Sequence, residues 1–166
     1  MHGQKNAERE ATTVVRPYQQ GDQPAFQALN EAWIRRYFVL ETKDHEILGD
    51  PEGAILGQGG AILFATVDGL PVGCCALIAD GPAQYELSKM AVHEDYQGRG
   101  IGRKLIKAAI ETAKRMGARR IHLETNAILL PALRLYQSAG FTPVPIEEKY
   151  TSQYSRGDTF LELWLH

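Results

Sequence analysis

The chain has 166 residues, of which 44% are hydrophobic and 23% charged, so its composition is that of a soluble globular domain and not of a disordered or collagen-like chain. Its 18 Lys and Arg residues against 20 Asp and Glu give a formal charge of -2, so no overall positive field favours nucleic acid as a partner. The apolar runs fall short of the roughly 20 residues that cross a membrane, so no membrane association is expected.

The first ten residues are polar and lack the apolar core of a signal peptide. We therefore expect a cytoplasmic protein with a flexible tail over residues 1–12 and a single domain over residues 13–166. Cys74 and Cys75 are adjacent, which excludes a disulfide framework. They are expected to act as small hydrophobic residues on opposite faces of a strand.

The N-terminal half of the domain predicts one long helix followed by strands. Apolar residues three or four apart after Asp22 indicate an amphipathic helix that ends near Phe38. An acidic segment follows to Gly60, with a short helix over residues 43–48. Two apolar runs, residues 61–67 and 71–79, flank an Asp-Gly pair and predict an antiparallel hairpin, and residues 85–93 predict a third strand.

In the C-terminal half the apolar period changes from two to 3.6 after Gly100, which predicts an amphipathic helix that ends at Gly117. The remaining expected elements are a strand over residues 120–125, a helix from Pro131 to about Ser138, and a last strand over residues 159–165. The order of helices and strands predicts an α/β fold with a mixed sheet.

The segment Gln97-Gly98-Arg99-Gly100-Ile101-Gly102-Arg103-Lys104 lies between a predicted strand and a predicted helix. Alternating glycines allow the backbone to approach a ligand closely, and a helix N-terminus favours anions. Acidic side chains are usually favoured there, but this helix start carries cations, which indicates a polyanionic ligand. A glycine-rich turn with solvated cations remains the alternative interpretation.

Several other kinds of site are excluded by spacing. The loop has Arg103 where a Walker A motif needs its second glycine, and it lacks the third glycine of a dinucleotide-binding fingerprint. His93-Glu94 is followed by Gln97 where a zinc-protease helix has histidine, and the other histidines show no ligand spacing, so no metal is expected. No Gly-x-Ser-x-Gly motif is present.

Three segments together resemble the GNAT superfamily of acyl-CoA-dependent N-acyltransferases: the loop over residues 97–102, the strand over residues 86–92, and the helix and Gly-Phe pair over residues 135–141. This resemblance implies a three-layer α/β fold, in which helices flank a mixed, mostly antiparallel sheet. The two central strands, residues 85–93 and 120–125, would splay apart.

The resemblance also implies acetyl-CoA as cosubstrate and no metal. The pantetheine arm would bind the backbone along the central strand, and the pyrophosphate would bind the glycine loop. Many family members have an asparagine seven residues before the tyrosine of the last helix, but Leu129 stands there, so Asn126 is a weaker candidate. The expected cofactor-binding residues are Met90, Ala91, Val92, Gln97, Gly98, Arg99, Gly100, Gly102, Arg103, Asn126 and Tyr136.

Two residues are candidates for catalysis. Keeping an amine with a pKa near 10.4 neutral at pH 7 costs about 4.6 kcal/mol, and a carboxylate within reach can remove its proton. Glu86 lies where the resemblance often places a catalytic glutamate, and Tyr136 would stand beside the leaving thiolate as acid. The alternatives are a structural carboxylate for Glu86 and a core aromatic for Tyr136.

The acceptor site is less clearly indicated. Trp33, Tyr37 and Glu41 are candidate substrate-binding residues, and Tyr150 and Tyr154 are further aromatic candidates. The acidic segment over residues 41–52 attracts cationic amines in one interpretation and is a solvated loop in the other.

The predicted function is therefore transfer of an acetyl group from acetyl-CoA to a primary amine of a small molecule or amino acid, by direct attack in a ternary complex. The alternatives are a protein or peptide N-acetyltransferase and a non-catalytic acyl-CoA-binding sensor. A homodimer is suggested by family analogy alone.

Overall fold

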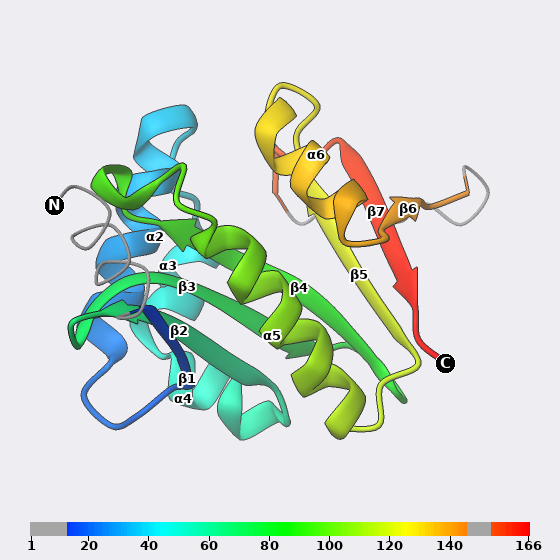
Figure 1. The fold of residues 1–166 in the computed structure, drawn as a ribbon, viewed down its shortest axis with the longest axis horizontal. Helices are drawn as coiled ribbons and strands as arrows, with labels where there is room; N and C mark the ends of the chain where they lie inside the picture. Colours follow the sequence, from blue (N-terminus) through cyan, green and yellow to red (C-terminus); the bar gives the residue numbers. More distant parts are fainter. Residues whose placement is uncertain (1–12, 146–153) are drawn as a thin grey trace, which may run out of the picture.

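A seven-stranded sheet forms the centre of the protein, with the strand order β1-β2-β3-β4-β5-β7-β6 (Figure 1). The computed structural model describes residues 13–145 and 154–166; the predicted flexible tail over residues 1–12 lies outside them. Strands β4 and β5 are parallel, and the other neighbouring strands are antiparallel. The strands are β1 (Thr13–Pro17), β2 (Ala61–Val67), β3 (Leu70–Ala79), β4 (Gln84–Val92), β5 (Arg120–Thr125), β6 (Thr142–Pro143) and β7 (Thr159–Trp164).

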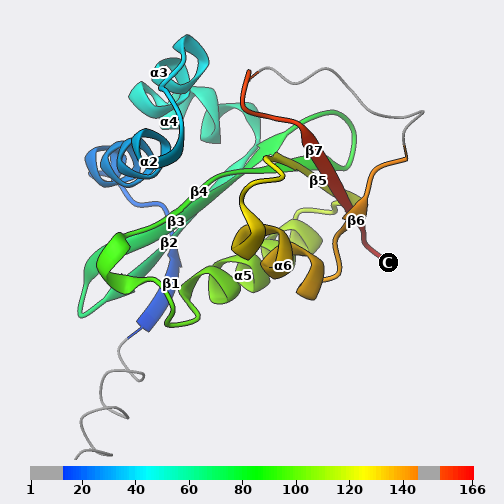
Figure 2. The ribbon, with the colours of Figure 1, turned by 90° about the horizontal axis from the view of Figure 1, so that it is seen from above.

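Helices cover both faces of this sheet, which gives the three layers that were predicted (Figure 2). One face carries α2 (Gln23–Tyr37), α3 (Thr42–Gly49) and α4 (Pro51–Ala54), and the other carries α5 (Ile101–Arg115) and α6 (Leu130–Ser138). Short 3-10 turns lie at Leu56–Gln58 and Glu94–Tyr96. Within the described ranges, no helix is both long enough and apolar enough to span a membrane.

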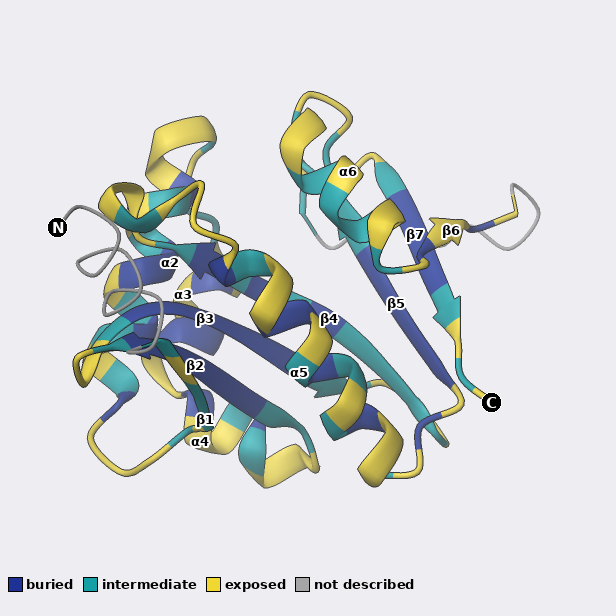
Figure 3. Ribbon diagram, viewed as in Figure 1, coloured by how far each residue is buried: buried dark blue, intermediate teal, exposed yellow. Residues whose placement is uncertain are grey.

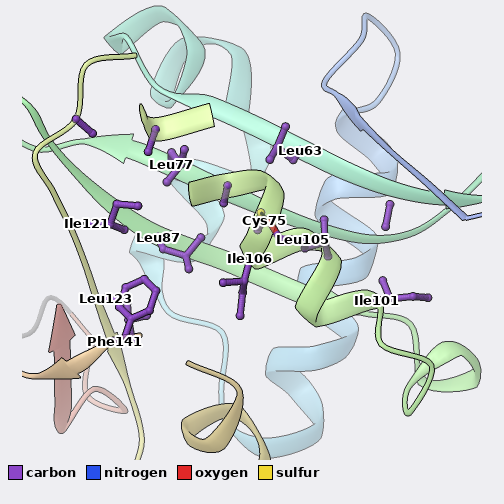
Figure 4. Close-up of a cluster of buried hydrophobic side chains, with 14 of the residues drawn as sticks. Leu63, Cys75, Leu77, Leu87, Ile101, Leu105, Ile106, Ile121, Leu123 and Phe141 are labelled. Carbon is purple, nitrogen blue, oxygen red and sulfur yellow. Dashed lines mark hydrogen bonds between the residues drawn. The ribbon is translucent and has the colours of Figure 1, made fainter. Parts of the chain in front are cut away.

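The two helical layers enclose two hydrophobic clusters. One cluster joins the sheet to α5, and Figure 4 shows Leu105 and Ile106 of that helix among sheet side chains such as Leu87. The other joins the opposite face to α2 and α3. Because both faces are covered, β2 and β3 are buried along most of their length (Figure 3). As predicted, the adjacent cysteines face opposite layers, with Cys74 in the α2 cluster and Cys75 in the α5 cluster.

The predicted splay of the two central strands is present. Pairing between β4 and β5 covers only their first residues and ends at the pair Glu86 and His122. In the part of the chain that the structure describes, no residue of β4 beyond Glu86 pairs with β5, and Figure 1 shows the two strands separating from there. The sheet is therefore closed at one end of these strands and split at the other.

A bulge interrupts β4 just inside the split. Ser88 pairs with Ala76 of β3, but the next pair along β4 is Ala91 with Cys74, so β4 has one extra residue between these pairs. The extra residue is accommodated at Lys89, whose φ of +52° is rare for a side chain other than glycine. The bulge lies in the part of β4, residues 86–90, that lines a cavity at the split.

Three elements were not predicted. β1 has a mixed burial pattern and no strict alternation, β6 has two residues, and α4 has four. Such short elements carry little periodic signal, because their formation depends on neighbouring strands and turns rather than on their own residues.

Candidate active site

Two adjoining cavities lie at the split. The loop cavity, of about 530 Å³, is bounded by the glycine loop, the end of β4 and α6. The strand cavity, of about 100 Å³, lies between the separated strands and α2. Both cavities are lined by Trp33, Met90, Leu129, Ala132 and Tyr136, so these residues form the boundary between them.

The glycine loop owes its shape to backbone conformation. Gly98 and Gly100 have φ values of +77° and +78°, which side chains other than glycine rarely adopt, and an added Cβ at either would meet nothing within 4 Å. At Gly102 space is the constraint, because a Cβ there would lie 3.0 Å from Leu135 Cδ2 and 3.2 Å from Met90 Cε. The start of α5 therefore lies against both α6 and β4.

Most of the predicted cofactor-binding residues gather around the loop cavity. Two do not line it: the Arg99 guanidinium lies 4.9 Å from the centre of the Tyr96 ring, and Asn126 lines the strand cavity instead. Asn126 Nδ2 donates to the carbonyl of Arg156 at 2.8 Å. The predicted residues that line the loop cavity are Met90, Ala91, Val92, Gln97, Gly98, Gly100, Gly102, Arg103 and Tyr136.

Glu86 lies at the closed end of the split and lines the strand cavity. Its register partner on β3, Ile78, packs against the α2 cluster, so the Glu86 side chain is on that face of the sheet. Burial raises the pKa of the Glu86 carboxyl to about 7, and the carboxylates of Glu124 and Asp80 add to this rise. A carboxyl group with such a pKa exchanges protons readily near neutral pH.

Tyr136 stands on α6 where the two cavities meet. Its hydroxyl lies 3.9 Å from Met90 Sδ, and its ring contacts Phe141 edge to face at 6.1 Å between centres. Burial raises the pKa of the Tyr136 hydroxyl to about 12, so the hydroxyl keeps its proton and can donate a hydrogen bond.

A buried ion cluster on the wall of the strand cavity was missed by sequence reasoning. Asp44 of α3, whose side chain is 0% exposed, accepts from Lys89 Nζ at 2.8 Å and from Arg156 Nη2 at 2.6 Å. Lys89 Nζ also donates to the Tyr154 hydroxyl at 3.0 Å, and Arg156 pairs with Glu41 at 3.2 Å. We call these five residues the Asp44 cluster. The one available signal was a lysine in the otherwise apolar end of the predicted strand.

This cluster corrects the picture of one acidic surface over residues 41–52. The carboxylates of the segment are engaged separately, because Asp44 and Glu41 bind Arg156 while Glu52 accepts from the Tyr18 hydroxyl. The side chain of Asp50 caps the start of α4. The solvated-loop alternative is wrong about the loop, since the segment is largely helical and Asp44 is buried, but Glu46, Asp50 and Glu52 are exposed to solvent.

The predicted acceptor-site residues are only partly brought together. Trp33 lines both cavities and Tyr37 lines the loop cavity, whereas Glu41 is held by Arg156 and lines neither. Tyr154 lines the strand cavity, and Tyr150 lies outside the described residues. Glu124, which sequence reasoning did not assign to the site, lines the strand cavity from β5. Across residues 13–145 and 154–166, no group of three or more His, Cys, Asp or Glu residues is arranged to hold a metal ion.

Comparison with known proteins decides the family. The family model described as the acetyltransferase (GNAT) family matches residues 23–141. The chain belongs to the GNAT family of acetyltransferases. It is 30% identical over 123 residues to the uncharacterized N-acetyltransferase YvbK of Bacillus subtilis, covering 72% of this chain and 79% of that protein. Like its GNAT relatives, it is an acyltransferase.

Other known proteins are similar over part of the chain or share its fold. The N-alpha-acetyltransferase RimI of Mycobacterium tuberculosis is 39% identical over 69 residues, which is 42% of each chain. A GNAT acetyltransferase from Staphylococcus aureus Mu50 shares the fold with a TM-score of 0.83 at 21% identity, over 93% of this chain and 99% of that one. The yncA protein of Salmonella typhimurium, solved with its cofactor acetyl-CoA, has a TM-score of 0.74 at 20% identity, over 93% and 95%.

Proposed function

We propose that this GNAT protein transfers the acetyl group of acetyl-CoA to a primary amine of a small molecule or amino acid, by direct attack in a ternary complex. The observation that carries the proposal is the position of Glu86. This residue combines a pKa near neutrality with a place at the closed end of the split, facing a small cavity that adjoins the loop cavity. A general base is most effective when its pKa lies near the working pH.

The residues around the loop cavity fit acetyl-CoA. A volume of about 530 Å³ lies within the range of small-molecule sites. The backbone N–H groups at the glycine-rich start of α5 would hold the pyrophosphate, with Arg103 supplying charge. The edge of β4 from Met90 to Val92, which has no pairing with β5 in the described structure, would bind the pantetheine amides as a neighbouring strand does. The bound cosubstrate supplies a thioester carbonyl.

Glu86 acts as the general base in this proposal. Its ionised carboxylate accepts a proton from the incoming ammonium group, directly or through one water, and leaves a neutral nitrogen with a free electron pair. Burial favours the neutral carboxyl, so the proton is bound more strongly than by an exposed glutamate. The same burial makes the carboxylate a stronger base than it would be in water.

Tyr136 acts at the sulfur atom. With a pKa of about 12 against about 8.5 for a thiol, complete proton transfer from the hydroxyl would be uphill by about 5 kcal/mol. This is more than the roughly 2 kcal/mol expected for an unperturbed tyrosine. We therefore assign Tyr136 as a hydrogen-bond donor that stabilises negative charge on sulfur, with the proton finally supplied by solvent or by the base.

The size of the strand cavity supports a small acceptor. A cavity of about 100 Å³ has room for an amine on a short chain. Trp33 and Phe38 supply apolar walls, and Glu86 and Glu124 supply negative charge that favours a cation. A second candidate acceptor is the N-terminal amine of a peptide, which is favoured by similarity to a protein named N-alpha-acetyltransferase RimI.

The test is to incubate the purified protein with acetyl-CoA and amino acids, polyamines, aminoglycosides or short peptides. Thiol release is followed and the products are identified by mass. Release that depends on a small amine supports the proposal, and release with peptides alone supports the second candidate. Acetyl-CoA binding with no acetylated product from any amine would favour the sensor alternative.

A further inference from the structure

The Asp44 cluster joins two parts of the molecule that the split separates. Lys89 belongs to the bulge of β4, on one side of the split. Arg156 precedes β7, on the side of β5. Asp44 contacts both residues from α3, which lies on the same side of the sheet as α2 (Figure 2). We propose that Asp44 is a positioning residue for acetyl transfer, which fixes the width of the strand cavity by bridging the two arms of the split sheet.

The Arg156 side of this bridge is tied firmly to β5. Asn126, directly after β5, donates from Nδ2 to the Arg156 carbonyl at 2.8 Å. The backbone N–H of Asp158 donates to the carbonyl of Thr125 at 3.1 Å, and Asp158 Oδ1 accepts from the N–H of Ala127 at 2.9 Å. A force on the Arg156 guanidinium is therefore transmitted to the end of β5.

The carboxylate of Asp44 is fully used by these partners. Oδ1 accepts from Lys89 Nζ and from Arg156 Nη2, while Oδ2 accepts from Arg156 Nη1 at 2.9 Å and from the backbone N–H of Glu41 at 2.9 Å. Arg156 thus binds both oxygens in a fork, a geometry that fixes orientation as well as distance. Although burial alone raises the pKa of Asp44, the hydrogen bonds from Arg156 and Lys89 hold it well below its usual value.

On the β4 side, the bridge ends at a strained residue. Lys89 holds a positive φ, which is uncommon for a residue with a Cβ and persists only where surrounding contacts impose it. Its ammonium group is fixed by Asp44 and by the Tyr154 hydroxyl. The residues on either side of it, Ser88 and Met90, line the strand cavity. Holding Lys89 therefore holds one wall of the acceptor site.

Charge balance distinguishes this positioning role from direct recognition of an anionic substrate. The two cations of the cluster, Lys89 and Arg156, face the two carboxylates of Asp44 and Glu41 at hydrogen-bond distances. An anionic group of a substrate would have to displace one of these carboxylates. The cluster therefore contributes shape to the cavity, while the charge offered to an amine comes from Glu86 and Glu124.

The decisive variant removes both partners of the buried pair at once. Removing one partner leaves an unpaired buried charge and risks unfolding, whereas replacing both often leaves the fold intact. In Asp44→Asn/Lys89→Met, Arg156 keeps its pair with Glu41. The inference rests on the proposed function, and we expect kcat/KM for the best amine to fall at least tenfold. The dissociation constant for acetyl-CoA should change less than twofold.

A matched control is provided by the ion pair between Arg16 and Asp22, which ties β1 to the start of α2 away from the split. The double variant Arg16→Met/Asp22→Asn should leave kcat/KM for the amine and the dissociation constant for acetyl-CoA within twofold of the wild-type values. The single variant Arg156→Lys keeps the positive charge but loses the forked pair of hydrogen bonds. Its kcat/KM for the amine should lie between those of the wild type and the decisive variant. Thermal unfolding verifies that every variant is folded.

Hydrogen exchange tests the bridge independently of activity. Amides of residues 87–92 and 157–160 should exchange at least tenfold faster in the decisive variant than in the wild type. In the control variant their exchange rates should be unchanged. If a folded decisive variant retains wild-type acceptor kinetics, or exchanges as slowly as the wild type, Asp44 is not a positioning residue. If the wild type acetylates no amine, the proposed function fails, and the exchange rates still decide whether Asp44 bridges the two arms.

Discussion

Glu86 and His122 lie opposite each other in parallel register and are the last residues that join β4 to β5. The backbone of Glu86 is thus fixed by strands on both sides, since it also pairs with Ile78 of β3. Its side chain nevertheless faces the strand cavity, directly before the strands diverge. A proposed base is thereby placed where neighbouring strands hold the backbone from both sides.

The first prediction concerns removal of this carboxylate. Glu86→Gln should lower kcat/KM for the acceptor amine about 100-fold or more, because proton removal by a positioned base is lost. Affinity for acetyl-CoA should be unchanged, since Glu86 lines the strand cavity and not the loop cavity. Steady-state kinetics and calorimetric titration measure the two quantities. Wild-type activity in a folded Glu86→Gln protein would remove Glu86 from the mechanism.

The pH profile provides a second prediction. Glu86 accepts a proton only when ionised, so the wild-type kcat/KM should rise about tenfold per pH unit below pH 7 and level off above it, following the pKa of about 7. In Glu86→Gln the plateau above pH 7 should disappear, because the remaining rate follows ionisation of the amine and keeps rising until about pH 10 for a lysine-like group. If kcat/KM of the variant still levels off above pH 7, the ionisation seen in the wild type belongs to another group.

The free energy of unfolding should fall over the pH range in which kcat/KM rises. The carboxyl pKa of Glu86 rises from 4.5 to about 7 on folding, so between these values the folded chain holds a proton that the unfolded chain has released. The wild-type free energy of unfolding should therefore fall by up to about 3 kcal/mol as the pH rises from 4.5 to 7. Glu86→Gln should gain stability over the wild type at pH 8 but not at pH 4. Denaturant titrations at these two pH values measure the difference.

The fourth prediction concerns the hydroxyl of Tyr136. Tyr136→Phe should lower kcat about 10- to 100-fold while leaving acetyl-CoA affinity within a few-fold, because one hydrogen bond to developing negative charge is lost. Tyr18→Phe is the matched control, since its hydroxyl binds Glu52 on the surface. Equal turnover in the two variants would place Tyr136 among the packing residues.

The fifth prediction compares two glycines that have nearly the same backbone φ angle. Gly100 and Gly69 have φ values of +78° and +79°, and neither has an atom within 4 Å of an added Cβ. Gly100→Ala and Gly69→Ala should therefore each cost about 1 kcal/mol of stability. Only Gly100→Ala should weaken acetyl-CoA binding, about fivefold or more, because Gly69 lies in the turn between β2 and β3. Equal affinities would exclude the loop as the pyrophosphate site.

Much of the fold could be predicted because its signals are local. The apolar stripe of α5, with Ile101 and Leu105 one turn apart, specifies both the helix and its buried face. The Asp-Gly turn after Val67 specifies the hairpin. The glycines of the loop indicate where the backbone adopts a left-handed conformation, and both Gly98 and Gly100 have positive φ.

The Asp44 cluster could not be predicted in the same way, because its members are far apart in sequence. Lys89 lies 45 residues from Asp44, and Arg156 lies 112 from it, so no periodic pattern links them. Asp44 in isolation looks like one more acid in a polar segment, and only the packing of α3 on the sheet buries it. The bulge has the same origin, since the conformation of Lys89 depends on contacts from two other parts of the chain.

The adjacent cysteines also provide the molecule with two natural reporters. Cys74 and Cys75 are 0% and 1% exposed, in opposite hydrophobic clusters, and burial raises the pKa of both thiols, that of Cys75 to about 12. Because the thiolate is the reactive form, neither should be alkylated until its own layer opens. The rate of alkylation at Cys74 therefore reports the detachment of α2, and the rate at Cys75 reports the detachment of α5. Comparing the two rates shows which helical layer separates from the sheet first.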